Sequence, residues 1–149
     1  MSTRIAAGFF DIGGTLGDPV LSGSPPQLKR LDVYADTIQV LERLRKVSVR
    51  LGIISNIGEV NAANIAAVKS ALTDAKLLTY FDESLFVFGE KDSTKIFKEA
   101  TLRAGLSSSP ESCVFAGEDE EERGFASEAG MQVADRPSSA VKLVEDSIA

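Results

Sequence analysis

The chain has 149 residues, none of them histidine, and only one cysteine. Without histidine it cannot carry a Ser-His-Asp triad, a histidine general base or a histidine-ligated zinc ion. The lone Cys113 cannot close an internal disulfide, and no histidine is present to activate it. We therefore expect Cys113 to be a buried structural thiol in a reducing compartment. Chemistry in this chain must come from carboxylates, lysine, hydroxyl groups and a bound metal ion.

Long apolar runs are also missing. No stretch approaches the roughly 20 apolar residues of a membrane span, and the first ten residues do not read as a signal peptide. We therefore expect a cytoplasmic protein that does not contact membranes. The formal net charge of −6 argues against nucleic-acid binding, which needs lysine and arginine to neutralise phosphates. A single phosphate group can still be held by a local cation, a metal ion or backbone amides.

Short apolar runs alternate with helical patterns, which predicts a three-layer, Rossmann-like α/β domain. Five runs predict the strands of a mainly parallel sheet: 5–10, 49–54, 85–88, 113–116 and 131–134. Apolar residues at helical spacing predict helices on both faces of the sheet, at about 36–47, 59–74, 96–104, 125–129 and 141–144. The length suits one domain over residues 1–149, and the Pro/Ser-rich stretch 22–26 is expected to be a loop within it.

Polar residues directly follow four of the predicted strands. These positions are Asp11, Ser55-Asn56, Glu90-Lys91 and Glu118-Asp119. In open parallel sheets, ligands bind outside the carboxyl ends of the strands. These side chains are therefore the candidate functional residues.

The same positions resemble, in order, the four motifs of the haloacid dehalogenase (HAD) superfamily of aspartate-dependent phosphatases. The first family motif, an apolar strand followed by Asp-x-Asp-Gly-Thr-Leu, has the counterpart FFDIGGTL around Asp11. The second, a strand ending in Ser or Thr, has the counterpart GIISN, which ends at Asn56. The third has the counterpart YFD followed by KDSTKIF, which starts at Lys91, and the fourth has VFAGED with AGM downstream. Each motif is weak alone, but four in order along nearly the whole chain are specific.

This resemblance implies a phosphatase chemistry for the strand-end residues. In the family the first aspartate attacks phosphorus and forms an aspartyl-phosphate, and that role falls to Asp11. The resemblance further implies a Mg²⁺ ion held by Asp11, the Gly13 carbonyl and either Glu118 or Asp119. It implies that Lys91 is a catalytic cation. The groups expected to hold the phosphate belong to Gly13, Gly14, Ser55, Asn56 and Lys91.

Gly13 departs from the family pattern. It stands where the family has its second aspartate, the general acid and base, and losing such a group typically costs about 10²–10⁴ in rate. Two hypotheses follow: a magnesium-dependent phosphomonoesterase that is slow or borrows another acid, and a non-catalytic HAD-like domain (a pseudophosphatase) that binds metal, phosphate or a protein partner. A phospho-acceptor receiver domain is a third alternative, which the Gly-Gly-Thr sequence disfavours.

Three further expectations concern the surroundings of the site. The short spacing between Asp11, Ser55 and Lys91 leaves no room for a cap domain, so we expect an open site that admits even a large phosphorylated substrate. Lys95 competes with Lys91 as the phosphate cation, and the Ile-Phe pair that follows in the family favours Lys91. The run 120–122 is expected to be a solvated acidic patch that starts a helix.

Overall fold

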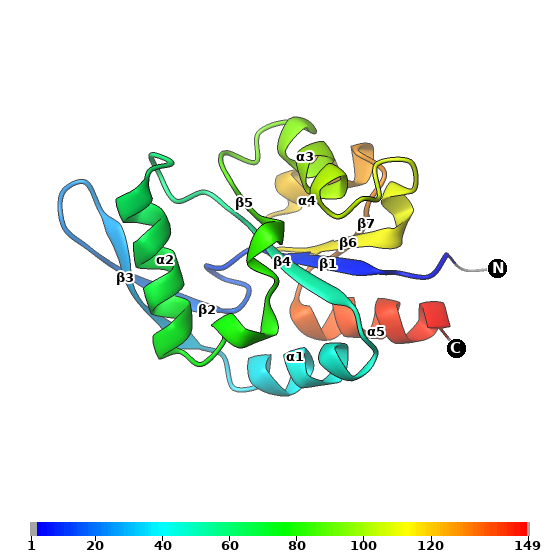
Figure 1. Cartoon of the computed structure of the whole chain (residues 1–149), viewed down its shortest axis with the longest axis horizontal. Coiled ribbons are helices and arrows are strands. Elements are labelled where there is room, and N and C mark those ends of the chain that lie inside the picture. Colours follow the sequence, from blue (N-terminus) through cyan, green and yellow to red (C-terminus); the bar gives the residue numbers. More distant parts are fainter. Residues whose placement is uncertain (1–2, 149) are drawn as a thin grey trace.

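The structure is a computed structural model and describes residues 3–148 (Figure 1). Five strands form one sheet in the order β5-β4-β1-β6-β7, and every neighbouring pair is parallel. The strands are β1 (Ala7–Phe10), β4 (Arg50–Ser55), β5 (Phe86–Phe88), β6 (Cys113–Ala116) and β7 (Gln132–Ala134). Each lies within two residues of a predicted strand. The prediction of a three-layer α/β fold with a parallel five-stranded sheet is confirmed.

Helices cover both faces of this sheet. Helices α1 (Thr37–Lys46) and α5 (Pro137–Ile148) pack on one face, and α3 (Lys95–Arg103) and α4 (Glu120–Glu128) on the other (Figure 1). Three 3-10 turns connect the larger elements: η1 (Leu78–Tyr80), η2 (Glu83–Leu85) and η3 (Pro110–Ser112). No described helix is both long and apolar enough to cross a membrane.

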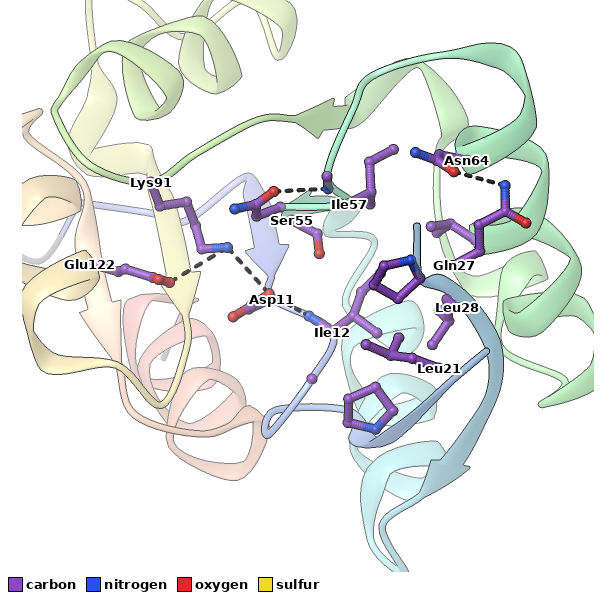
Figure 2. A pocket seen from close by; sticks show the side chains of 16 residues that line it. Asp11, Ile12, Leu21, Gln27, Leu28, Ser55, Ile57, Asn64, Lys91 and Glu122 are labelled. Carbon is purple, nitrogen blue, oxygen red and sulfur yellow. Dashed lines mark hydrogen bonds and ion pairs between the residues drawn. The ribbon is translucent and has the colours of Figure 1, made fainter. Parts of the chain in front are cut away.

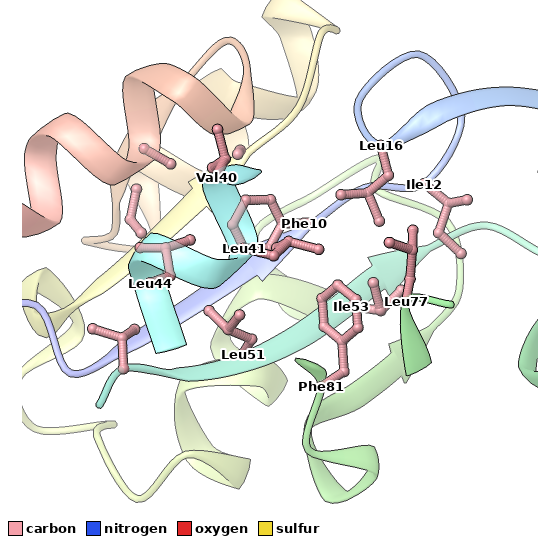
Figure 3. Close-up of a cluster of buried hydrophobic side chains, with 14 of the residues drawn as sticks. Phe10, Ile12, Leu16, Val40, Leu41, Leu44, Leu51, Ile53, Leu77 and Phe81 are labelled. Atoms are coloured by element: carbon pink, nitrogen blue, oxygen red, sulfur yellow. The ribbon is translucent and has the colours of Figure 1, made fainter. Parts of the chain in front are cut away.

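Each face of the sheet has its own hydrophobic core. Neighbouring residues of a strand point to opposite faces, so the adjacent Phe9 and Phe10, both fully buried, belong to different cores. Phe10 packs among side chains of α1, with Leu41 and Leu44 close by (Figure 3). Phe9 belongs to the core under α3 and α4. Packing in both cores therefore holds β1 in place, and with it the position of Asp11, the next residue.

A two-stranded antiparallel hairpin between β1 and α1 was not predicted. It consists of β2 (Gly17–Ser22) and β3 (Gln27–Val33), and the stretch predicted as a loop, 22–26, contains its turn. Helix α2 (Ala62–Asp74) packs against β3, and the two lie together at one side of the main sheet (Figure 1). β2 could not be predicted from the sequence for two reasons. The strand contains Pro19, and a register shift at Val20/Leu21 interrupts the alternation of its side chains.

Cys113, the first residue of β6, is fully buried as expected. Burial raises the pKa of its thiol to about 11, against an ordinary value of 9.0. At pH 8 this lowers the thiolate fraction about 100-fold, and the thiolate is the reactive form. We expect the folded protein to react with iodoacetamide at least about 100-fold more slowly than the protein in denaturant. Labelling of the native protein at the denatured rate would contradict this.

Candidate active site

A cavity of about 510 Å³ lies at the carboxyl ends of β1 and β4 (Figure 2). Asp11 enters it because β1 ends at Phe10, and the Asp11 backbone N–H donates to the Ala116 carbonyl of the neighbouring strand at 3.0 Å. Ser55, the last residue of β4, is buried and lines the same cavity together with Asn56. Strands adjacent in the sheet thus bring together residues that are distant in the sequence.

Lys91 completes the polar end of the cavity. Its side chain is only 4% exposed, and its Nζ lies 3.4 Å from Asp11 Oδ1 and 3.5 Å from Glu122 Oε1. A buried ammonium is costly unless anions compensate it, and these two carboxylates do so. The competing Lys95 is exposed at the start of α3 and is not among the residues that line this cavity. Of the two lysines, the structure places Lys91 beside Asp11.

Glu122 is a site residue that the sequence analysis missed. It lies in the first turn of α4, lines the cavity and has a buried Oε1 with no hydrogen-bond partner in the described chain, so the prediction that it is a solvated residue was wrong. Its contact with Lys91 is an ion pair without hydrogen-bond geometry. Burial raises the pKa of the Glu122 carboxyl, Lys91 opposes this shift, and the charges of Asp11 and Asp119 add to it. Because three glutamates follow one another in the sequence, the sequence alone could not predict that Glu122 is the one that faces the strand ends.

The two alternative metal ligands of the fourth motif are placed differently. Asp119 caps α4, with its side chain accepting a hydrogen bond from the Glu122 backbone N–H at 3.0 Å. The Glu118 carboxylate instead lies against Gly14, where an added Cβ would stand 2.1 Å from Glu118 Oε1. Gly14 also has a φ of +75°, which favours glycine. Glu118 and Gly14 line a neighbouring cavity of about 460 Å³ rather than the one that contains Asp11.

The oxygen donors at the carboxyl ends of β1 and β6 are of the type that a hard divalent cation prefers, and Mg²⁺ also keeps several waters. The Asp11 carboxylate and the Gly13 carbonyl lie in the loop after β1, whereas Glu118, in the loop after the adjacent strand β6, lines the neighbouring cavity. The Glu122 carboxylate, ion-paired with Lys91, is a further negative group that lines the cavity with Asp11. No group of three or more acidic, cysteine or histidine side chains within residues 3–148 is arranged to hold a metal. A cation here would therefore need the backbone carbonyl and water as well as carboxylates.

Gly13 lines the cavity next to Asp11 and is packed against the hairpin. An added Cβ would lie 3.1 Å from Pro19 Cγ and 3.4 Å from Pro19 Cδ. The φ of Gly13 is not positive, so its backbone accepts a side chain, but Pro19 would have to shift by a few tenths of an ångström. Position 13 thus carries no acidic side chain, and Pro19 crowds the space where one would begin.

No protein-family model matches the chain, and no curated protein matches it. Solved structures share its fold. A HAD-superfamily hydrolase from Ehrlichia chaffeensis is 14% identical with a TM-score of 0.72, and the match covers 100% of both chains. The D,D-heptose 1.7-bisphosphate phosphatase from B. bronchiseptica, complexed with magnesium and phosphate, is 11% identical with a TM-score of 0.68, covering 97% of this chain and 98% of the other. A HAD phosphatase from Thermococcus onnurineus is 29% identical over 69% of this chain and 46% of its own, with a TM-score of 0.56.

Proposed function

We propose that this chain, which has the fold of the HAD superfamily, is a magnesium-dependent phosphomonoesterase that acts through an aspartyl-phosphate on Asp11. One observation carries the proposal: a buried lysine, Lys91, lies 3.4 Å from the Asp11 carboxylate at the end of a cavity. Two anions approach each other when a carboxylate attacks a phosphate, and a fixed cation between them lowers that barrier. Three of the similar structures named above are HAD hydrolases or phosphatases, which supports the same class.

The proposed reaction has two steps. An Asp11 oxygen attacks phosphorus, the bond to the leaving alcohol breaks, and the alcohol oxygen takes its proton from water because Gly13 has none to give. Water then attacks the phosphorus of the aspartyl-phosphate and breaks its bond to the Asp11 oxygen, which releases inorganic phosphate and restores the Asp11 carboxylate. The proton that this water loses neutralises the hydroxide left by the first step. Magnesium, when bound, supplies charge neutralisation between nucleophile and phosphate. Lys91 binds the phosphoryl oxygens, and Glu122 holds the Lys91 ammonium in place.

The proposed function also includes a set of phosphate-binding groups and a site that no cap domain covers. The Ser55 hydroxyl and the Asn56 amide are the neutral donors at the polar end of the cavity, and Gly13, which also lines it, lets the backbone approach the phosphate. Gly14, predicted to do the same, lines the neighbouring cavity instead. We further propose that residues 1–149 form one domain without a cap.

A non-catalytic HAD-like domain is the second candidate, and Gly13 favours it. Pro19 crowds the position where the family's acid would begin, so the chain has retained the anion-binding groups without that acid. Such a pseudophosphatase would bind magnesium, phosphate or a protein partner at the same cavity. A pseudophosphatase that binds magnesium or phosphate differs from the first candidate only in turnover.

The test combines turnover with trapping of the intermediate. Wild type is incubated with Mg²⁺ and a panel of phosphomonoesters, and the acid-quenched protein is digested and analysed by mass spectrometry. We expect phosphate release and one phosphoryl group on the peptide that contains Asp11, and neither in Asp11→Asn. The matched control is Asp74→Asn, which removes an exposed carboxylate at the end of α2. Binding of phosphate without turnover would select the second candidate, and loss of both would reject both.

Glu118 and Asp119 can be separated by metal affinity. Glu118→Gln is expected to weaken Mg²⁺ binding by about tenfold or more, or ~1.4 kcal/mol. Asp119→Asn should leave both the affinity and the stability nearly unchanged, because asparagine caps a helix as well as aspartate does. Isothermal titration of Mg²⁺ into each variant measures this. The reverse ranking would assign the metal to Asp119.

A further inference from the structure

The cavity that contains Asp11 has two chemically different ends (Figure 2). Its charged lining residues, Asp11, Lys91 and Glu122, gather at one end. The other end is neutral, and its apolar wall comes from the β2–β3 hairpin, the loop after β4 and α2: Pro19, Leu21, Pro26, Leu28, Ile57 and Val68. A phosphate group needs only the charged end, so the apolar wall remains available to the rest of a substrate.

The size of the cavity supports a small organic ligand. Its volume of about 510 Å³ falls within the range of roughly 300–1,000 Å³ typical of small-molecule sites. Leu21 lies on its wall and is 56% exposed, so much of its apolar surface faces water in the unliganded protein. Covering such a side chain with an apolar group releases water and stabilises the complex.

A pair of amides marks the neutral end. Gln27 Nε2 donates to Asn64 Oδ1 at 2.9 Å, and Asn64 Nδ2 donates to the Glu59 carbonyl at 2.7 Å. Asn64 is buried and held at both ends of its amide, so it fixes the exposed Gln27. The side-chain oxygen of Gln27, Oε1, accepts no hydrogen bond from the residues that the structure describes. It can therefore accept a hydrogen bond from a ligand that reaches this end.

The balance of charge limits what that ligand can be. Lys91 is the one cation among the described residues that line the cavity, and it already faces two carboxylates. A second phosphate or a carboxylate at the neutral end would lose hydration without meeting a positive charge, which is unfavourable. The lining therefore discriminates against bisphosphates and phosphorylated acids.

We infer that the substrate is the monophosphate of a small, neutral, mainly apolar alcohol. Its carbon chain lies against the hairpin and α2, and any polar group at its far end is a donor that Gln27 accepts. This inference rests on the proposed phosphatase function and names its substrate class. It also narrows the sequence-based expectation, which allowed a large substrate.

Alkylphosphonates test the inference without requiring turnover, because their P–C bond is not hydrolysed. Wild type with Mg²⁺ is titrated with methylphosphonate, hexylphosphonate and a hexylphosphonate that carries a terminal carboxylate. Each buried methylene contributes about fourfold in affinity, so along a half-open wall hexylphosphonate should bind about 10–100-fold more tightly than methylphosphonate. The terminal carboxylate should remove most of this gain.

Two leucine variants locate the effect. Leu21→Ser should weaken hexylphosphonate several-fold and leave methylphosphonate unchanged. Leu102→Ser, at a leucine of α3 that is 60% exposed and outside the cavity, should change neither. Equal affinity for the methyl and hexyl ligands, or tighter binding of the carboxylate, would overturn the substrate class while the phosphate site stands. If no phosphonate or inorganic phosphate binds at all, the proposed function itself fails.

Discussion

Placing an acid at position 13 is expected to raise turnover of alkyl phosphates by about 10²–10⁴ in the double variant Gly13→Asp, Pro19→Ala. An alkoxide is a poor leaving group, and an aspartic acid beside it would supply the proton that Gly13 cannot. The effect should be smallest for p-nitrophenyl phosphate, whose leaving group departs without a proton. Steady-state kinetics on a matched pair of alkyl and aryl phosphates measures the difference.

Contact with Pro19 is expected to limit the gain in turnover of the single variant Gly13→Asp. A Cβ at Gly13 would lie 3.1 Å from Pro19 Cγ, so Gly13→Asp alone should push the hairpin and gain less than the double variant. Pro19→Ala alone is the matched control and should not raise turnover. Mg²⁺ affinity should stay nearly constant throughout, because the ligand proposed at this position is the backbone carbonyl. Rapid turnover of alkyl phosphates by wild type would mean that another acid serves.

Removing the buried cation should disable the site. Lys91→Met is expected to lower kcat/KM by about 10²–10³, the usual result of removing one preorganised group that stabilises developing charge. Methionine fills a similar volume, so the loss comes from charge rather than from a cavity. The matched control is Lys95→Met, at an exposed lysine outside the cavity, which should retain activity. Equal losses in the two variants would contradict the assignment of Lys91.

The same substitution should also change how stability depends on pH. Lys91 lowers the pKa of the Glu122 carboxyl, which burial has already raised above 4.5, so Lys91→Met should raise it further. A group with a raised folded-state pKa contributes stability that is fully present below the unfolded value and lost as pH rises through the folded one. The Tm of Lys91→Met should therefore fall more between pH 5 and pH 8 than that of wild type. Adding Glu122→Gln should remove the extra slope without restoring activity.

The main sheet could be predicted because its strands are short apolar runs with polar residues directly after them. That pattern is local, and β6 was predicted at its observed bounds, 113–116. Residues that follow parallel strands were predicted to lie together, since such strands end at the same edge of the sheet. Asp11, Ser55 and Lys91 do line one cavity. These outcomes follow from periodicity and sheet geometry, both of which a single sequence carries.

The remaining features depend on contacts between distant segments. The hairpin is stabilised by packing on α2, and its Pro19 and register shift erase the alternation that would mark a strand. Glu122 is indistinguishable in sequence from its two acidic neighbours, and only the path of α4 turns it towards Lys91. The crowding of Gly13 by Pro19 and the apolar wall arise where the hairpin folds over the strand ends. No local pattern encodes these contacts.

The central place of β1 in the sheet has a consequence for synthesis on the ribosome. β1 is made before both of its partners, and it pairs with β4 on one edge and with β6 on the other. At about 5–20 residues per second, β6 leaves the ribosome roughly 3–12 s after β4. During that interval one edge of β1 offers unpaired backbone groups beside apolar side chains, the kind of surface on which strands of different chains associate. The edge of β1 that pairs with β6 therefore stays open to association with other chains until β6 has been made.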